Sequence, residues 1–140
     1  METKLTQEEE RVREILISVA STRGIIYYTE LCRKAALKLD MNIPADRGKI
    51  GHILGSISSF EHDLGHPLLS SVVVSRNMEQ GDGFFKLAEE LGYGEWQKLK
   101  KGKQFEFDMM NKTHDFWAKR SKALTIISVT YWVCPGYWIE

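Results

Sequence analysis

One apolar stripe constrains the fold of this chain more than any other feature of its sequence. Six apolar residues recur at the spacing of a single helix face: Ile50, Ile53, Leu54, Ile57, Phe60 and Leu64. Pro44 is well placed for the first turn of such a helix, and Gly65 followed by His66 and Pro67 is a typical stop signal. The stripe therefore predicts a long helix between these two points, with its apolar face in the core.

The opposite face of the same predicted helix carries three glycines, Gly48, Gly51 and Gly55. A glycine inside a helix costs about 1 kcal/mol relative to alanine, so their presence there needs a compensating reason. One reason is tight packing against a neighbouring helix. The other is close approach of the helix backbone to a nucleic-acid strand, and the sequence leaves both open.

Composition indicates one globular unit in two unlike parts. The chain has 140 residues, 43% of them hydrophobic, and its 19 basic and 19 acidic residues give a net charge of zero. Residues 1–94 hold 11 basic and 14 acidic residues, a net charge of −3, whereas residues 95–140 hold 8 and 5, a net charge of +3. All four tryptophans lie in the second part. We expect a core at 1–94 and an aromatic-rich, basic extension at 95–140 that packs on it.

The remaining pattern predicts alternating helices and short strands. Thr6 and Glu9 form a capping-box pattern at the start of a helix that ends near Ser21. Further helices are expected over 29–39, 84–91 and 105–117. Runs rich in β-branched and aromatic residues predict strands at 25–28, 68–74 and 124–133, the last broken by Pro135 and Gly136. The predicted fold is α+β: a winged-helix-like helix-turn-helix core with a C-terminal helix and strand, in which the loop 76–83 is the wing.

Parts of residues 8–92 resemble the C-terminal domain of O6-alkylguanine-DNA alkyltransferases and alkyltransferase-like proteins. The segment 26–32 (IYYTELC) is similar to the strand-and-helix start of that domain, and 47–54 (RGKIGHIL) is similar to its recognition helix. The resemblance implies a DNA-binding scaffold. The reactive Pro-Cys-His-Arg tetrad of the family has no counterpart, because Ser70 and Ser71 stand at the matching place. Alkyl transfer is therefore not expected.

If the glycine-bearing helix reads nucleic acid, its positive and donor groups should make the contacts. The predicted contact residues lie on that helix and on the loop that follows it: Arg47, Lys49, His52, Ser56 and Arg76. A second possibility is single-stranded nucleic acid stacking on Trp96 and Trp117 among the C-terminal lysines. The alternative for that cluster is a solvated helix face whose aromatic residues dock on the core.

The sequence offers little for catalysis or metal binding. His62 and His66 are four residues apart, but Gly65 is expected to end the helix before His66, so the two imidazoles would not share a face. Ser70 and Ser71 fall in a predicted strand rather than on a sharp nucleophile turn. We therefore expect no enzyme activity, no cofactor and no metal.

Two hypotheses for the function remain at this point. The first is a non-catalytic nucleic-acid-binding protein, with DNA as its partner. The alternative is a small protein-interaction module, such as an immunity or antitoxin-like partner protein, because the neutral charge, the aromatic-rich extension and the glycine-lined helix suit a protein surface as well. The polar N-terminus without an apolar signal core predicts a cytoplasmic protein that does not enter a membrane.

Overall fold

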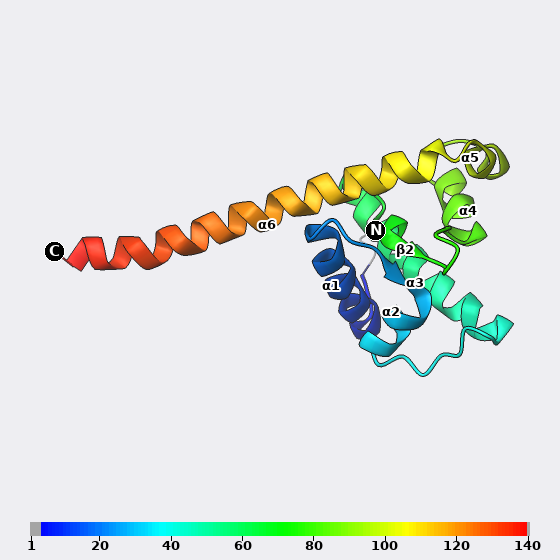
Figure 1. Cartoon of the computed structure of the whole chain (residues 1–140), viewed down its shortest axis with the longest axis horizontal. Helices are drawn as coiled ribbons and strands as arrows, with labels where there is room; N and C mark the ends of the chain where they lie inside the picture. The colour runs from blue at the N-terminus through cyan, green and yellow to red at the C-terminus, as the bar shows by residue number, and fades with distance from the viewer. Residues whose placement is uncertain (1–3, 140) are drawn as a thin grey trace.

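The computed structural model describes the backbone of residues 4–139 and the side chains of residues 4–121. Helix accounts for 68% of the chain, in six α-helices, and the described strands form one small two-stranded sheet (Figure 1). The expected α+β winged-helix fold is therefore wrong. A winged helix needs a β-hairpin as its wing, and this sheet pairs two strands of two residues each in parallel.

The elements follow one another along the chain in a simple order. The helices and strands have these bounds: α1 Gln7–Ser21, β1 Ile26–Tyr27, α2 Tyr28–Lys34, α3 Pro44–Asp63, the 3-10 turn η1 Leu69–Val72, β2 Val73–Val74, α4 Asp82–Glu90, α5 Trp96–Gly102 and α6 Gln104–Ile139. Figure 1 shows the first part of α6 lying across α1, while α4 and α5 lie together near the start of α6.

Local signals position α1 as the sequence predicts. The Thr6 side chain accepts a hydrogen bond from the Glu9 backbone nitrogen, and the Glu9 carboxylate accepts one from the Thr6 nitrogen. These two bonds satisfy amide groups that have no partner inside the helix. The capping box is therefore confirmed, and it starts α1 at the residue where its apolar face, with Val12 and Leu16 fully buried, can meet the core.

The long helix predicted from the apolar stripe is confirmed as α3. Ile50, Ile53, Leu54 and Ile57 are buried in the main core cluster with α1, α2 and Trp117 of α6. Leu64 differs, because α3 ends at Asp63 and the Leu64 side chain is 53% exposed. The stripe therefore lies in the core up to the last turn, where the chain turns away through Gly65 at φ 76°.

The segment 68–74 (LLSSVVV) is not the expected strand, since most of it forms the 3-10 turn η1. Its hydroxyl groups explain this conformation. Ser70 bonds to Ser58 of α3, with 2.7 Å between the two oxygens, and Ser71 bonds to Thr113 of α6 at 3.0 Å. Because η1 is buried between three helices, these side-chain contacts override the β-propensity of its valines.

Two further expectations for the second half of the chain need correction, and one helix was not expected. The loop expected as a wing contains no strand between Ser75 and Gly81. The segment 96–102, which gave no clear signal, forms α5. The expected strand 124–133 lies inside the bounds of α6, because no glycine or proline interrupts the chain between Gln104 and Pro135 to stop the helix.

Within the described residues, we find no helix that combines the length and the apolar character needed to cross a membrane.

Candidate functional site

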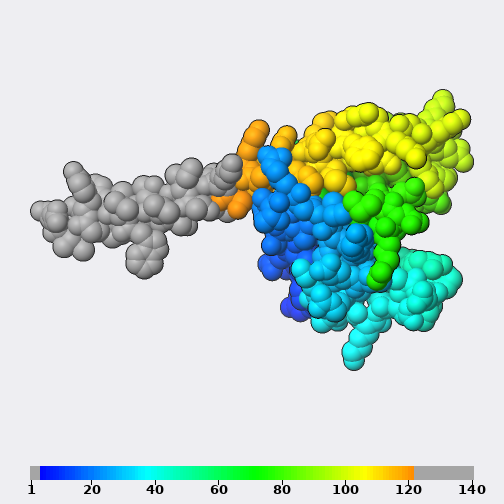
Figure 2. Space-filling view, in the orientation of Figure 1, coloured from blue at the N-terminus to red at the C-terminus, as the bar shows by residue number. Residues whose placement is uncertain are grey.

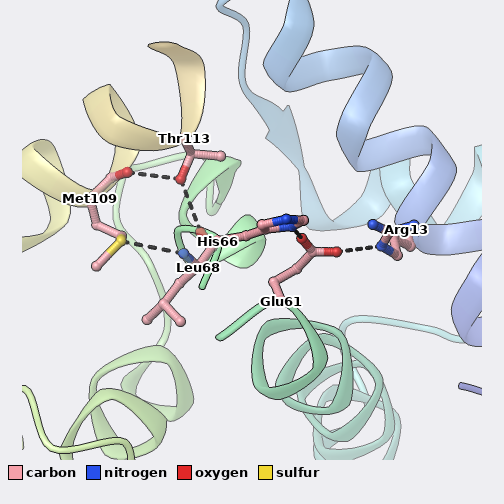
Figure 3. A network of polar contacts seen from close by, with 6 residues as sticks. All are labelled: Arg13, Glu61, His66, Leu68, Met109 and Thr113. Atoms are coloured by element: carbon pink, nitrogen blue, oxygen red, sulfur yellow. Dashed lines mark hydrogen bonds and ion pairs between the residues drawn. The ribbon is translucent and has the colours of Figure 1, made fainter. Parts of the chain in front are cut away.

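A buried carboxylate at the end of α3 is the first polar site of note. The Glu61 side chain is fully buried, and Figure 3 shows it between two cationic or donor groups. Arg13 Nε of α1 donates to Glu61 Oε1, and His66 Nδ1 lies 2.6 Å from Glu61 Oε2. The His66 ring packs against Phe116 and Trp117 of α6, with ring centres 4.5 and 5.7 Å apart. This junction therefore connects α1, α3 and α6.

The neighbouring polar groups in Figure 3 also form hydrogen bonds within the chain. Thr113 Oγ1 donates to the carbonyl oxygens of Met109 and Leu68, and the Leu68 nitrogen donates to Met109 Sδ at 3.3 Å. None of these residues lines either of the two cavities described below. The polar groups of the junction are paired with one another, which is the arrangement of a structural connection.

An open groove on the other side of α3 is the stronger candidate. Its cavity volume is about 860 Å³, and it lies between the N-terminal half of α3, the loop 75–81 and the first turns of α4. We call it the α3–α4 groove. Figure 2 shows one part of its border, where the green residues of the loop and α4 lie next to the teal start of α3. A volume of this size is within the usual range for ligand sites.

The glycine face of α3 forms one wall of this groove. Gly48, Gly51 and Gly55 all line it, and an added Cβ at any of them would find no described atom within 4 Å outside its own helix. Tight packing against a neighbouring helix, one of the two explanations left open by the sequence, is therefore wrong. The glycines instead leave the helix backbone accessible from the groove.

The opposite wall begins at the carboxyl ends of the parallel strands. Tyr27 pairs with Val74 at this end of the sheet, and the next residues, Tyr28 and Ser75, both line the groove. The Tyr28 hydroxyl accepts a hydrogen bond from the Gly81 nitrogen at 3.1 Å, which fixes the end of the loop. Burial raises the pKa of the Tyr28 hydroxyl, and the Gly81 hydrogen bond opposes this shift, so Tyr28 is a neutral group at physiological pH.

Gln80 contributes the most unusual polar group of the groove. Its side chain is 5% exposed, and its Nε2 donates to the Ser71 carbonyl oxygen at 2.7 Å. This bond assigns the amide, because a carbonyl oxygen can accept from the nitrogen but not from the oxygen. Gln80 Oε1 then finds no hydrogen-bond partner among the described residues. An unsatisfied buried acceptor costs about 1 to 3 kcal/mol, and this oxygen has no surface exposed to the groove.

The charges along the groove are mixed. Lys100 is paired with Asp82 within the chain, and the resulting hydrogen bond raises the pKa of the Lys100 ammonium. Arg47 donates to the Met41 carbonyl oxygen at 3.0 Å, and Arg76 is exposed. Among the described residues neither arginine takes part in an ion pair. Because Glu79 also lines the groove, its charged groups are of both signs.

The structure separates the five residues predicted to contact nucleic acid. Arg47 and Arg76 both line the α3–α4 groove. Lys49 and His52 lie on another side of α3, where they line a hollow of about 710 Å³ beside the end of α2. Lys49 is also 3.9 Å from Asp46, and Ser56 lines neither cavity. The five residues therefore do not form one surface.

The other sequence candidates have structural partners. Ser70 and Ser71 are buried and bonded to other hydroxyl groups, and His62 lies against Tyr93 rather than beside His66. In the part of the chain with described side chains, no group of three or more histidine, cysteine or acidic residues is arranged to hold a metal ion. Trp117 is 7% exposed, so it offers no free face for stacking on nucleic acid.

Sequence reasoning missed the groove itself. Phe84 and Leu87 of α4 form part of its lining, and the sequence shows them as one face of a short helix. For Gln80 the sequence predicts only a place in a polar loop. The one signal that could have indicated the site is the row of glycines opposite the apolar stripe, since it predicts an accessible helix backbone whatever the ligand.

No family model, curated protein or solved structure matches this chain. The resemblance of residues 8–92 to the alkyltransferase domain therefore stays a prediction from the residues themselves.

Proposed function

We propose that this chain is a non-catalytic binding module and that its α3–α4 groove takes up a segment of a partner protein. The observation that carries the proposal is the open glycine face of α3. Gly48, Gly51 and Gly55 weaken the helix without packing against any described atom, and their cost is offset once a ligand approaches the backbone there.

The lining of the groove favours a protein partner over nucleic acid. Ile50, Leu54, Phe84 and Leu87 give the groove an apolar surface, as in the centre of protein interfaces. A nucleic-acid surface instead presents several cations to a row of phosphates. Here Lys100 is neutralised by Asp82, and Lys49 and His52 lie on another side of α3.

The hydroxyl groups along the groove support a binding role rather than catalysis. Tyr28 accepts a bond from the Gly81 nitrogen, and Ser75 accepts one from the Asn77 nitrogen at 3.3 Å. Ser70 is bonded to Ser58. A serine nucleophile needs a neighbouring base such as histidine, and these hydroxyls contact backbone nitrogens or another serine.

The test compares protein capture with nucleic-acid binding for the same variants. Gly51→Leu should place a side chain in the groove, because a Cβ at this position meets no described atom, and Gly102→Leu adds the same side chain outside the groove. We expect immobilised wild type and Gly102→Leu to retain a host protein from nuclease-treated lysate, and Gly51→Leu to lose it. Fluorescence anisotropy with duplex and single-stranded oligonucleotides should show no groove-dependent binding.

Two results would contradict the proposal. One is capture that Gly51→Leu leaves intact, and the other is oligonucleotide binding at low salt that Gly51→Leu or reversal of Arg47 and Lys49 to glutamate removes. The second result would favour the nucleic-acid hypothesis.

A further inference from the structure

We propose that α6 binds an anionic lipid surface through its residues 112–139. Basic side chains of this part of the helix contact the lipid headgroups, and the segment 123–139, which we call the uncharged segment, enters the surface layer of the bilayer. The proposal does not depend on the α3–α4 groove. It departs from the expectation, drawn from the polar N-terminus, that the chain does not enter a membrane.

A row of lysines extends past the point at which α6 leaves the core. Trp117 is 7% exposed, whereas residues 119–121 are all exposed. Lys112 and Lys119 are both exposed and lie seven residues apart, and Lys122 follows three residues later. Because residues at these intervals share one side of a helix, the three lysines form a single row along α6.

Acidic groups do not neutralise this row. Asp115 is the only acidic residue between Lys112 and Lys122, and its Oδ1 already accepts a bond from Arg23 at 2.7 Å. Arg23 follows α1, so this pair places the end of α1 beside the row, and residues 15–23 contain no acidic side chain. The lysines therefore carry an excess of positive charge, which is complementary to anionic headgroups.

The uncharged segment follows the row directly. Residues 123–139 contain no acidic residue, lysine, arginine or histidine, and they lie within the bounds of α6, so this part of the helix has no charged face. A helix exposed to water normally carries charged side chains on one face, and a helix in contact with lipid does not need them. The segment also holds the aromatic residues that are typical of the membrane–water interface: Tyr131, Trp132, Tyr137 and Trp138.

The length of the uncharged segment suits binding at the surface of a bilayer. Its 17 residues span about 25 Å as a helix, whereas the hydrocarbon core of a bilayer is about 30 Å thick. Charged residues, Lys122 and Glu140, stand directly before and after it. One apolar segment alone binds lipid weakly, and an adjacent basic patch supplies the second contribution that stable binding requires.

A second copy of the chain suits the uncharged segment less well than lipid does. Helices that pair in water bury one apolar stripe and keep charged residues beside it, and those charges select the partner. The uncharged segment has no such residues, so a pair of these helices would still expose apolar surface to water. Parallel pairing would also bring two rows of lysines together, and like charges repel.

The experiment measures binding of the full chain to vesicles by co-sedimentation. One set of vesicles contains phosphatidylcholine alone, and the other contains phosphatidylcholine mixed with phosphatidylserine. We expect binding to the mixed vesicles, much weaker binding to phosphatidylcholine, and a loss of affinity as salt is raised, because salt screens the lysine contacts.

Lysine variants test the role of the basic row. Each cation near an anionic surface contributes about 5-fold in affinity, so Lys119→Gln combined with Lys122→Gln should weaken binding about 25-fold. The matched control combines Lys49→Gln with Lys101→Gln, which removes the same charge from exposed positions outside α6 and should leave binding unchanged.

Aspartate variants test the uncharged segment. Ile127→Asp combined with Trp132→Asp should abolish binding, because two carboxylates would have to leave water. The control combines Met78→Asp with Phe107→Asp, which adds the same charge at apolar residues that are 55% and 58% exposed, and it should retain binding. Circular dichroism of each variant confirms that it folds.

Brominated lipids test entry into the bilayer directly, because bromine on the acyl chains quenches a tryptophan that reaches them. The wild type should lose fluorescence on brominated mixed vesicles. Trp132→Phe combined with Trp138→Phe should remove this quenching and keep most of the binding.

Three results would overturn the proposal. One is the absence of binding to the mixed vesicles, and another is binding that the aspartate pair in the uncharged segment or the Lys119 and Lys122 pair leaves unchanged. The third is a lipid-free oligomer in gel filtration that Ile127→Asp with Trp132→Asp converts to a monomer while vesicles bind no protein, which would assign the uncharged segment to contacts between copies of the chain.

Discussion

The two ends of α3 are built in opposite ways. Near its C-terminal end, the oxygens of Glu61 are held by Arg13 and His66, and Ser58 is bonded to Ser70. Within its first twelve residues, Gly48, Gly51 and Gly55 face open space. One end of the helix is closed by contacts from α1, from η1 and from His66, and the other end is left open to the groove.

This contrast separates what stabilises the chain from what it is proposed to bind. The closed end connects three elements that are distant in sequence, so its residues should control the free energy of unfolding. The open end lacks contacts that would add stability, and its glycines reduce the helix propensity of α3. Substitutions at the two ends should therefore change the free energy of unfolding in opposite directions.

The largest effect is expected for Glu61→Ala. Loss of this carboxylate leaves Arg13 and His66 without their partner in a buried site, which should lower the free energy of unfolding by about 3 to 5 kcal/mol. Urea denaturation followed by circular dichroism measures this. Glu30→Ala is the control, because Glu30 is 41% exposed and pairs with two exposed cations, so its loss should cost less than about 1 kcal/mol. Equal effects of the two substitutions would show that the junction does not stabilise the fold.

The second prediction tests where the buried part of the apolar stripe ends. Ile57 is fully buried and Leu64 is 53% exposed, although the sequence places both in the same stripe. Ile57→Ala should cost about 2 to 5 kcal/mol, because it removes buried methyl groups and leaves a cavity. Leu64→Ala should change stability by less than about 0.5 kcal/mol. A large loss for Leu64→Ala, measured by the same denaturation, would mean that this residue is covered in solution.

Local sequence signals predicted much of the helical structure. The capping box of Thr6 and Glu9 and the spacing of Ile50, Ile53 and Ile57 depend on residues close together in the chain, and both are confirmed. The fold class failed where contacts are long-range. Ser70 and Ser71 turn η1 away from a strand through Ser58 and Thr113, and no periodicity within 68–74 indicates those partners.

The candidate site was predictable in part. The glycine row was visible in the sequence, but whether Gly51 faces a helix or open space depends on where α4 and the loop 75–81 lie. Gln80 is polar and lies beside a glycine, which is typical of an exposed loop. Its burial follows from the bond to the Ser71 carbonyl oxygen, and a backbone acceptor nine residues away leaves no pattern in the sequence.

The smallest expected change in stability is an increase, whereas Glu61→Ala and Ile57→Ala should lower stability. Gly51→Ala should raise the free energy of unfolding by about 0.5 to 1 kcal/mol, because alanine favours the helix and its Cβ meets no described atom. Thermal unfolding of this variant and of the wild type measures the change. Destabilisation by Gly51→Ala would mean that the glycine face is packed, and the contrast between the two ends of α3 would be lost.

The most direct test of the groove as the binding site uses the glycine amides as reporters in an NMR titration. Five of the ten glycines that the structure describes line the groove, namely Gly48, Gly51, Gly55, Gly81 and Gly83. The other five, Gly24, Gly65, Gly92, Gly94 and Gly102, lie outside it. Addition of the host protein captured from lysate to the ¹⁵N-labelled chain should shift the amide signals of the first set and leave the second set in place. Shifts confined to the second set, or spread equally over both, would contradict the assignment of the groove as the binding site.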